Sequence, residues 1–126
     1  HVVIYHHVEV EDHVHIDSGT VIGADGFGLY RTKDGWKKIP QVGSVHIKND
    51  VWIGAHCTLD RGALEHTVLA AGVKLDDQVH IGHGAKIGAH TVIAGQTGIA
   101  GSTEVGEFCM LGGGCRVSDH LKIPDN

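Results

Sequence analysis

A branched aliphatic residue returns at every sixth position between residues 69 and 123 without interruption. We call these ten positions anchors: Leu69, Leu75, Ile81, Ile87, Ile93, Ile99, Val105, Leu111, Val117 and Ile123. A period of six fits neither an α-helix nor a flat strand, which repeat about every 3.6 and 2 residues. It predicts a parallel β-helix, in which each hexad supplies a short strand and a turn and three hexads close one triangular coil.

The other positions of the hexad support this interpretation. The residue four places after each anchor is usually small, as at Ala85, Thr91 and Cys109. Small side chains suit a narrow prism interior that is filled from three sides. The residue directly after the anchor is often Gly or Ala, as at Gly82 and Gly88, so we expect the tight corner of the coil there.

The repeat also covers the start of the chain and is interrupted twice. Anchors at Ile4, Val10, Ile16 and Ile22 precede a stretch without the period, which resumes at Ile47. We expect an external loop over about residues 28–44, acting either as a flap over a neighbouring subunit or as a substrate contact. Four extra residues before Leu69 predict a small bulge at about 62–67.

Together these features predict one all-β solenoid domain over residues 1–126, with about seven triangular coils. The first residue is His1 rather than Met, and both ends of the sequence fall within the repeat. We therefore expect the chain to be the core of a longer protein whose N-terminal and C-terminal parts are absent.

Composition excludes several classes of function. The formal net charge of -5 argues against a nucleic-acid-binding protein, which needs a basic face for phosphates. The sequence contains no run of about 18 apolar residues, which a membrane-spanning helix would need. Cys57, Cys109 and Cys115 all lie four residues after an anchor, so we expect three buried, reduced thiols and a cytoplasmic location.

Five of the twelve histidines fall at outward or turn positions of the hexad, where a solvated side chain is the simplest interpretation. These are His13, His15, His56, His80 and His90. His83 is different, because residues eighteen apart stack one coil above the other, roughly 4.8 Å away. With the bulge excluded, one row contains Arg61, His83, Gly101 and Asp119.

A base beside an exposed glycine N–H is the minimum that acyl transfer needs. The base, His83, would take a proton from the attacking group, and the Gly101 N–H would stabilise the oxyanion. His120 lies on the same face but two coils above His83, which suits a substrate contact and excludes a direct relay. The column Lys86, Glu104 and Lys122 is either a solubilising charge ladder or a docking patch for an acidic carrier protein.

Four stretches resemble the solenoid domain of the UDP-3-O-(3-hydroxyacyl)glucosamine N-acyltransferases of lipid A biosynthesis. They are SGTVIGADGFG (18–28), KIPQVG (38–43), TLDRGALEHT (58–67) and FCMLGG (108–113). The resemblance implies a left-handed coil and a cytoplasmic homotrimer with active sites between subunits. It also implies transfer of a 3-hydroxyacyl chain from the phosphopantetheine arm of acyl carrier protein to the 2-amine of a UDP-glucosamine-type lipid precursor, without a metal or other cofactor.

The resemblance places the general base on His83, the oxyanion glycine on Gly101 and a second cleft histidine on His120. Arg61, Asp76 and Asp77 are further candidates for substrate binding, although the stacking of the coils does not place either aspartate beside His83. The family usually has Asn directly after the catalytic histidine, whereas this chain has Gly84.

Four other interpretations remain open from the sequence. Two are related enzymes, an acetyl-CoA-dependent sugar N-acetyltransferase and the O-acyltransferase of the same pathway. A third is a γ-class carbonic anhydrase, for which only His1 and His6 have the required spacing and a third zinc ligand would be needed. The fourth is a non-catalytic scaffold, in which replacement of His83 has no effect.

Overall fold

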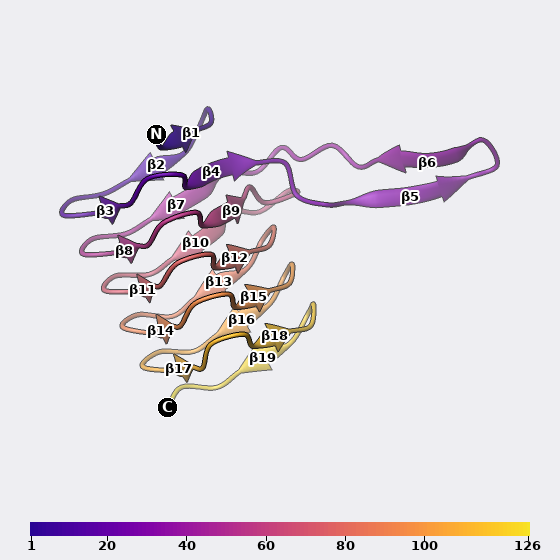
Figure 1. The fold of residues 1–126 in the computed structure, drawn as a ribbon. Coiled ribbons are helices and arrows are strands. Elements are labelled where there is room, and N and C mark those ends of the chain that lie inside the picture. The colour runs from indigo at the N-terminus through magenta and orange to yellow at the C-terminus, as the bar shows by residue number, and fades with distance from the viewer.

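Three parallel sheets form the sides of a triangular prism in the computed structural model, which describes all residues 1–126 (Figure 1). Sheet A contains β1 (Val3–Ile4), β4 (Val21–Ala24), β9 (Thr58–Asp60), β12 (His80–Ile81), β15 (Gly98–Ile99) and β18 (Arg116–Val117). Sheet B contains β2 (Glu9–Val10), β7 (Val45–Ile47), β10 (Thr67–Leu69), β13 (Lys86–Ile87), β16 (Glu104–Val105) and β19 (Lys122–Ile123). Sheet C contains β3 (His15–Ile16), β8 (Trp52–Ile53), β11 (Lys74–Leu75), β14 (Val92–Ile93) and β17 (Met110–Leu111).

The fold is the predicted left-handed parallel β-helix. Ile81 pairs with Ile99, and Ile99 pairs with Val117, so the stacking period is eighteen residues. No helix long and apolar enough to span a membrane is present.

The core is the column of anchors inside the prism. Ile53, Ile81 and Ile99 are fully buried, as the period of six predicts. Most of the second inward positions are also buried, and their threonines are satisfied. For example, the Thr91 hydroxyl donates to the Gly106 carbonyl at 2.7 Å and accepts from the Cys109 N–H at 3.0 Å. A buried hydroxyl with both bonds made carries little desolvation cost.

The expected place of the corner within the hexad is wrong. Positive φ angles occur three residues after the anchor, as at Gln78, Gly84 and His120, whereas directly after an anchor only Gly23 has one, at the register shift in β4. Glycine follows the anchor for a different reason, because a Cβ on Gly82 would lie 2.7 Å from the Gly101 backbone nitrogen. At Gly82 the next coil approaches too closely for a side chain.

The cysteine prediction is confirmed for two of three residues. Cys57 and Cys109 are buried, but Cys115 is exposed. No coil within residues 1–126 packs over Cys115, so the inward position alone does not shield it.

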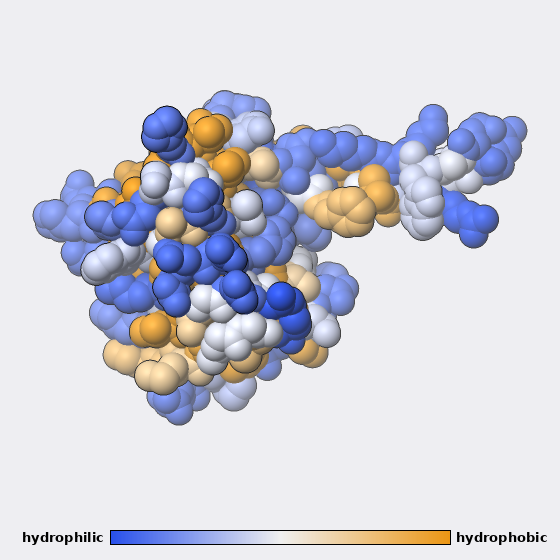
Figure 2. Space-filling view, in the orientation of Figure 1, coloured by the Kyte–Doolittle hydropathy of each residue, from blue (hydrophilic) through white to orange (hydrophobic).

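The external segment contains regular structure that the sequence does not predict. Strands β5 (Leu29–Thr32) and β6 (Gly35–Lys38) form an antiparallel hairpin that projects away from the prism (Figure 1). We call residues 29–38 the arm. It is mostly hydrophilic (Figure 2), and Trp36 on it is 69% exposed. The predicted bulge is also present, because residues 61–66 carry no strand between β9 and β10.

Candidate active site

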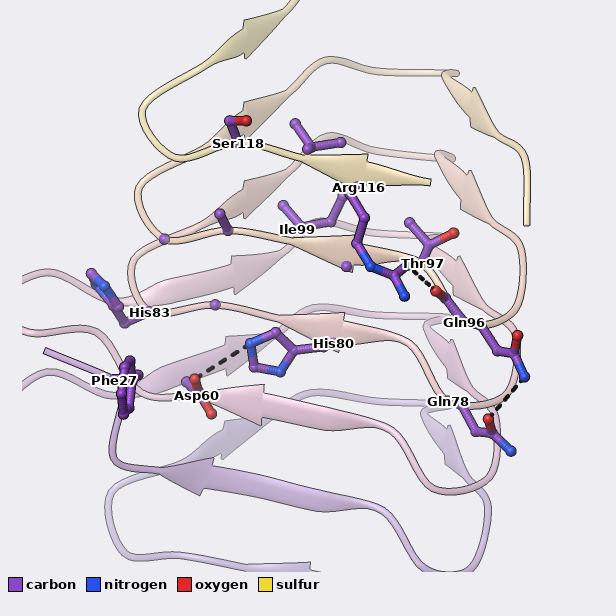
Figure 3. Close-up of a pocket in the computed structure, with 15 residues that line it drawn as sticks. Phe27, Asp60, Gln78, His80, His83, Gln96, Thr97, Ile99, Arg116 and Ser118 are labelled. Atoms are coloured by element: carbon purple, nitrogen blue, oxygen red, sulfur yellow. Dashed lines mark hydrogen bonds and ion pairs between the residues drawn. The ribbon is translucent and has the colours of Figure 1, made fainter. Parts of the chain in front are cut away.

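A cavity of about 570 Å³ runs along the outer surface of sheet A. Its walls come from successive coils. One further residue, Phe27, comes from the base of the arm, by which we mean the segments that lead into and out of residues 29–38 (Figure 3). Asp60, His80, His83 and Gly101 are among its lining residues.

His83 and Gly101 meet as the eighteen-residue row predicts. A methyl group added to Gly101 would lie 2.5 Å from His83 Nε2 and 2.7 Å from its Cε1. The imidazole therefore occupies the space that a side chain on Gly101 would fill. The Gly101 N–H donates no hydrogen bond to any protein group, although the Gly101 carbonyl accepts one from the His120 N–H at 3.2 Å. The structure thus places an imidazole beside an unused backbone donor.

The base of the arm passes over the other side of His83. A methyl group on Gly26 would lie 2.6 Å from His83 Cβ and 2.8 Å from Gln41 Oε1. Gln41 is only 8% exposed, and its Oε1 is buried without a hydrogen-bond partner. Two of the stretches that carry the family resemblance, GADGFG and KIPQVG, therefore converge on His83.

Asp60 and His80 are site residues that the sequence analysis missed. The Asp60 side chain is 14% exposed, its Oδ2 lies 3.7 Å from His80 Nε2, and the Thr58 hydroxyl lies 2.7 Å from His80 Nδ1. Burial raises the pKa of Asp60 above its ordinary value, while positive charge on His80 or His83 opposes that shift. The strand register could have pointed to His80, because Thr58 and His80 are paired neighbours on sheet A.

Arg61 lies in the predicted row, but its side chain faces the protein interior. It is 3% exposed, and its guanidinium donates to the Gly23 carbonyl at 2.8 Å and to the His6 carbonyl at 2.9 Å. Its Nε also lies 3.8 Å from an Asp25 carboxylate oxygen. In this conformation Arg61 ties the base of the arm to the first coil and does not line the cavity.

Asp76 and Asp77 lie at a different corner of the prism from His83, as the stacking argument allows. Asp77 Oδ1 accepts the Ala55 N–H at 2.8 Å, and Asp76 Oδ2 accepts the Gly95 N–H at 3.0 Å. Both carboxylates therefore bond the backbone of an adjacent coil, and neither contacts His83.

His120 shares a second, smaller cavity with His83. This cavity has a volume of about 420 Å³ and also includes Ser102, Lys86 and Glu65. His120 is exposed, and its Nε2 lies 4.0 Å from an Asp119 carboxylate oxygen. The two histidines therefore face a common opening at the corner between sheets A and B.

The predicted charge column on sheet B is present. Lys86 pairs in register with Glu104, and Glu104 with Lys122, while the Lys122 ammonium lies 3.3 Å from Glu104 and that of Lys86 lies 3.5 Å from Glu65. These exposed pairs contribute little to stability individually. Nowhere in the chain do three His, Cys, Asp or Glu side chains gather closely enough to hold a metal ion.

Comparison with known proteins gives consistent matches. The family model described as "Bacterial transferase hexapeptide (six repeats)" matches residues 66–101. The chain is 50% identical over 124 residues to a UDP-3-O-acylglucosamine N-acyltransferase from Hahella chejuensis, covering 98% of this chain and 36% of that protein. It is 54% identical over 126 residues to the protein of the same name from Coxiella burnetii, covering 99% of this chain and 37% of that protein. The chain thus spans little more than a third of these relatives.

Solved structures agree on the fold. UDP-N-acetylglucosamine O-acyltransferase from Moraxella catarrhalis matches with a TM-score of 0.76 at 18% identity, over 98% of this chain and 60% of that one. A UDP-N-acetylglucosamine acyltransferase from Bacteroides fragilis matches with a TM-score of 0.61 at 19% identity, over 98% and 53%. At these identities the likeness concerns the fold alone.

Proposed function

Because this chain is a hexapeptide-repeat solenoid identical at about half of its positions to UDP-3-O-acylglucosamine N-acyltransferases, we propose that it is the catalytic core of such an enzyme. The reaction is transfer of a 3-hydroxyacyl chain to the 2-amine of UDP-3-O-acylglucosamine, as a step of lipid A biosynthesis. The observation that carries the proposal is the His83 imidazole packed on Gly101, whose N–H has no protein partner.

These two groups are sufficient for the chemistry of acyl transfer to an amine. The amine nitrogen attacks the thioester carbonyl of the donor, and His83 accepts the proton that the nitrogen loses. The carbonyl oxygen becomes an oxyanion, and the Gly101 N–H donates a hydrogen bond to it. When the tetrahedral intermediate collapses, the amide forms, the carbon–sulfur bond breaks, and the thiolate takes the proton from His83.

The surroundings of His83 suit this role. Gly26 and Gly101 pack on the ring from two sides, which fixes its position without using its nitrogens in hydrogen bonds to the protein. The partly buried Asp60 carboxylate lines the same cavity. Its negative charge favours the imidazolium that forms during the transfer.

The proposed function also includes an acyl donor and an oligomeric state. The acyl donor is a thioester on the phosphopantetheine arm of acyl carrier protein, an acidic partner to which Lys86 at the corner between sheets A and B offers a positive charge. The enzyme acts in the cytoplasm as a homotrimer, with a neighbouring subunit closing the open side of the cavity. Its own residues carry the proton and stabilise the oxyanion, so no metal or other cofactor is needed for these steps.

The test is an acyl-transfer assay with the full-length enzyme that contains this chain, using 3-hydroxyacyl carrier protein and UDP-3-O-acylglucosamine. His83→Ala is expected to lower the turnover by about 10² to 10⁴, the usual contribution of a general base. Circular dichroism and the oligomeric state should be unchanged, because His83 is not part of the core.

Other outcomes point to the remaining interpretations. Transfer only from acetyl-CoA would replace the proposal with a sugar N-acetyltransferase. A His83→Ala variant with full activity would exclude the histidine base, and a parent enzyme without transfer from either donor would favour a scaffold solenoid.

A further inference from the structure

One backbone arrangement recurs where adjacent coils meet at a corner. The residue three places after an anchor donates its N–H to the carbonyl of the residue two places after the anchor in the coil before. Asp50 donates in this way to Asp12, Gln78 to Ala55, His120 to Gly101 and Asn126 to Glu107, at 2.8 to 3.2 Å. The four corners are therefore equivalent in their backbone.

At each of these corners an Asp or Asn side chain stands beside the N–H of the preceding coil. In three of the four cases it accepts that N–H. Asn49 accepts from Asp12 at 2.9 Å, Asp77 from Ala55 at 2.8 Å and Asp125 from Glu107 at 2.8 Å. We call this bond the cap.

The fourth corner is the exception, and it is the one in the candidate active site. Asp119 occupies the capping position over Gly101, because its neighbour His120 makes the same backbone bond as the other three corners. The Gly101 N–H nevertheless donates no hydrogen bond to Asp119. The Asp119 carboxylate instead lies 4.0 Å from Nε2 of His120, and both side chains are more than 70% exposed.

We propose that His120 is a positioning residue, which draws the Asp119 carboxylate away from the Gly101 N–H and so keeps the oxyanion donor free. The inference rests on the function proposed above, since it concerns the same N–H. It assigns His120 a role in the chemical step in addition to the substrate contact expected from the sequence.

The Asp119 carboxylate can move between the Gly101 N–H and His120 at little cost in free energy. The exposed contact of Asp119 with His120 and an exposed hydrogen bond to the Gly101 N–H are each weak, so the two positions of Asp119 are close in free energy. A capped N–H is unavailable to the substrate, and a carboxylate at that point also repels the developing oxyanion. A weak attraction from His120 is therefore sufficient to change the fraction of enzyme that is competent.

The decisive variants separate charge from the ability to cap. Asp119→Asn keeps a capping oxygen, as Asn49 shows, but loses the attraction to His120, so kcat should fall by about threefold to tenfold, the range that one net hydrogen bond supports. Asp119→Ala cannot cap, and kcat should rise, because nothing competes for the N–H. Alanine fits there, since Ala55, Ala71 and Ala89 occupy the same position in other coils.

The rescue experiment tests the role of His120. His120→Ala should lower kcat by a similar factor, and adding Asp119→Ala should restore it. If the double variant stays as slow as His120→Ala, or if the loss is entirely in KM, His120 acts on the substrate and the proposal is wrong. Asp125→Ala removes an equivalent cap far from His83 and should leave kcat unchanged.

A measurement without turnover distinguishes this proposal from the proposed function. Hydrogen exchange of the Gly101 amide, followed by NMR in the full-length protein, should be slower in Asp119→Asn and His120→Ala than in the parent. This pattern in an enzyme that transfers no acyl group would leave the inference intact and refute the function. Equal exchange in all variants would refute the inference whatever the activity.

Discussion

At the corner between sheets C and A, the Ala55 N–H is bonded to Asp77 Oδ1 at 2.8 Å. At the corner between sheets A and B, the equivalent Gly101 N–H is bonded to no protein group and lies beside the His83 imidazole. The backbone is the same at both corners, because each makes the same bond between successive coils. The next coil places an aspartate over each N–H, Asp77 over Ala55 and Asp119 over Gly101, so the two corners differ in whether that carboxylate accepts the N–H.

Among variants that leave the coil backbone in place, Gly101→Ala should cause the largest loss of activity. The added methyl would lie 2.5 Å from His83 Nε2, so the ring must move, and a displacement of about 1 Å at a reacting group costs about 10² in rate. We expect that loss in kcat for acyl transfer.

Its matched control is Gly113→Ala, at the same hexad position of the corner between sheets C and A. There the nearest atom to the added methyl is 3.3 Å away, so turnover should change little. Equal losses in the two variants would mean that the coil, and not the contact with His83, is sensitive to the methyl group.

Asp60→Asn tests the charge beside the site. We expect a several-fold lower kcat, because the negative charge that favours the His83 imidazolium is lost. The thermal stability of the Asp60→Asn variant should be higher than that of the parent near neutral pH. The pKa of Asp60 is raised in the folded state, so its contribution to stability is full below the unfolded value of about 3.9 and is lost as pH rises through the folded value.

Thermal unfolding of both proteins between pH 3 and pH 8 checks this sign. The variant should be the more stable at pH 7, and the difference should shrink as Asp60 becomes protonated at low pH. A variant that is less stable at pH 7 would mean that the contact between Asp60 and His80 outweighs the cost of burial.

The smallest effect is expected at the corner between sheets C and A. Asp77→Ala removes the cap on Ala55 and should lower the free energy of unfolding by about 1 kcal/mol, the net contribution of one hydrogen bond. Chemical denaturation measures this loss. A raised KM with unchanged stability would instead support the substrate-binding role that the sequence suggests for Asp77.

The arm shows how far sequence reasoning reaches beyond the repeat. The loss of the period after Ile22 correctly predicts an external segment. The hairpin within it has no period of its own that the hexads could reveal. Its base packs on His83 at Gly26, and Gln41 lies beside Gly26. These residues are 57 and 42 positions from His83 in the sequence, and no spacing rule connects them to the site.

The prism, its register and the meeting of His83 with Gly101 can all be predicted from the residues alone. These follow from a period of six and a stacking distance of eighteen, and both are fixed by the regular backbone. The direction of the Arg61 side chain, the presence of Asp60 and His80 in the site and the capping of the corner N–H groups are seen only in the folded molecule. Those outcomes depend on side-chain conformation and on contacts between distant segments, which a repeating backbone leaves free.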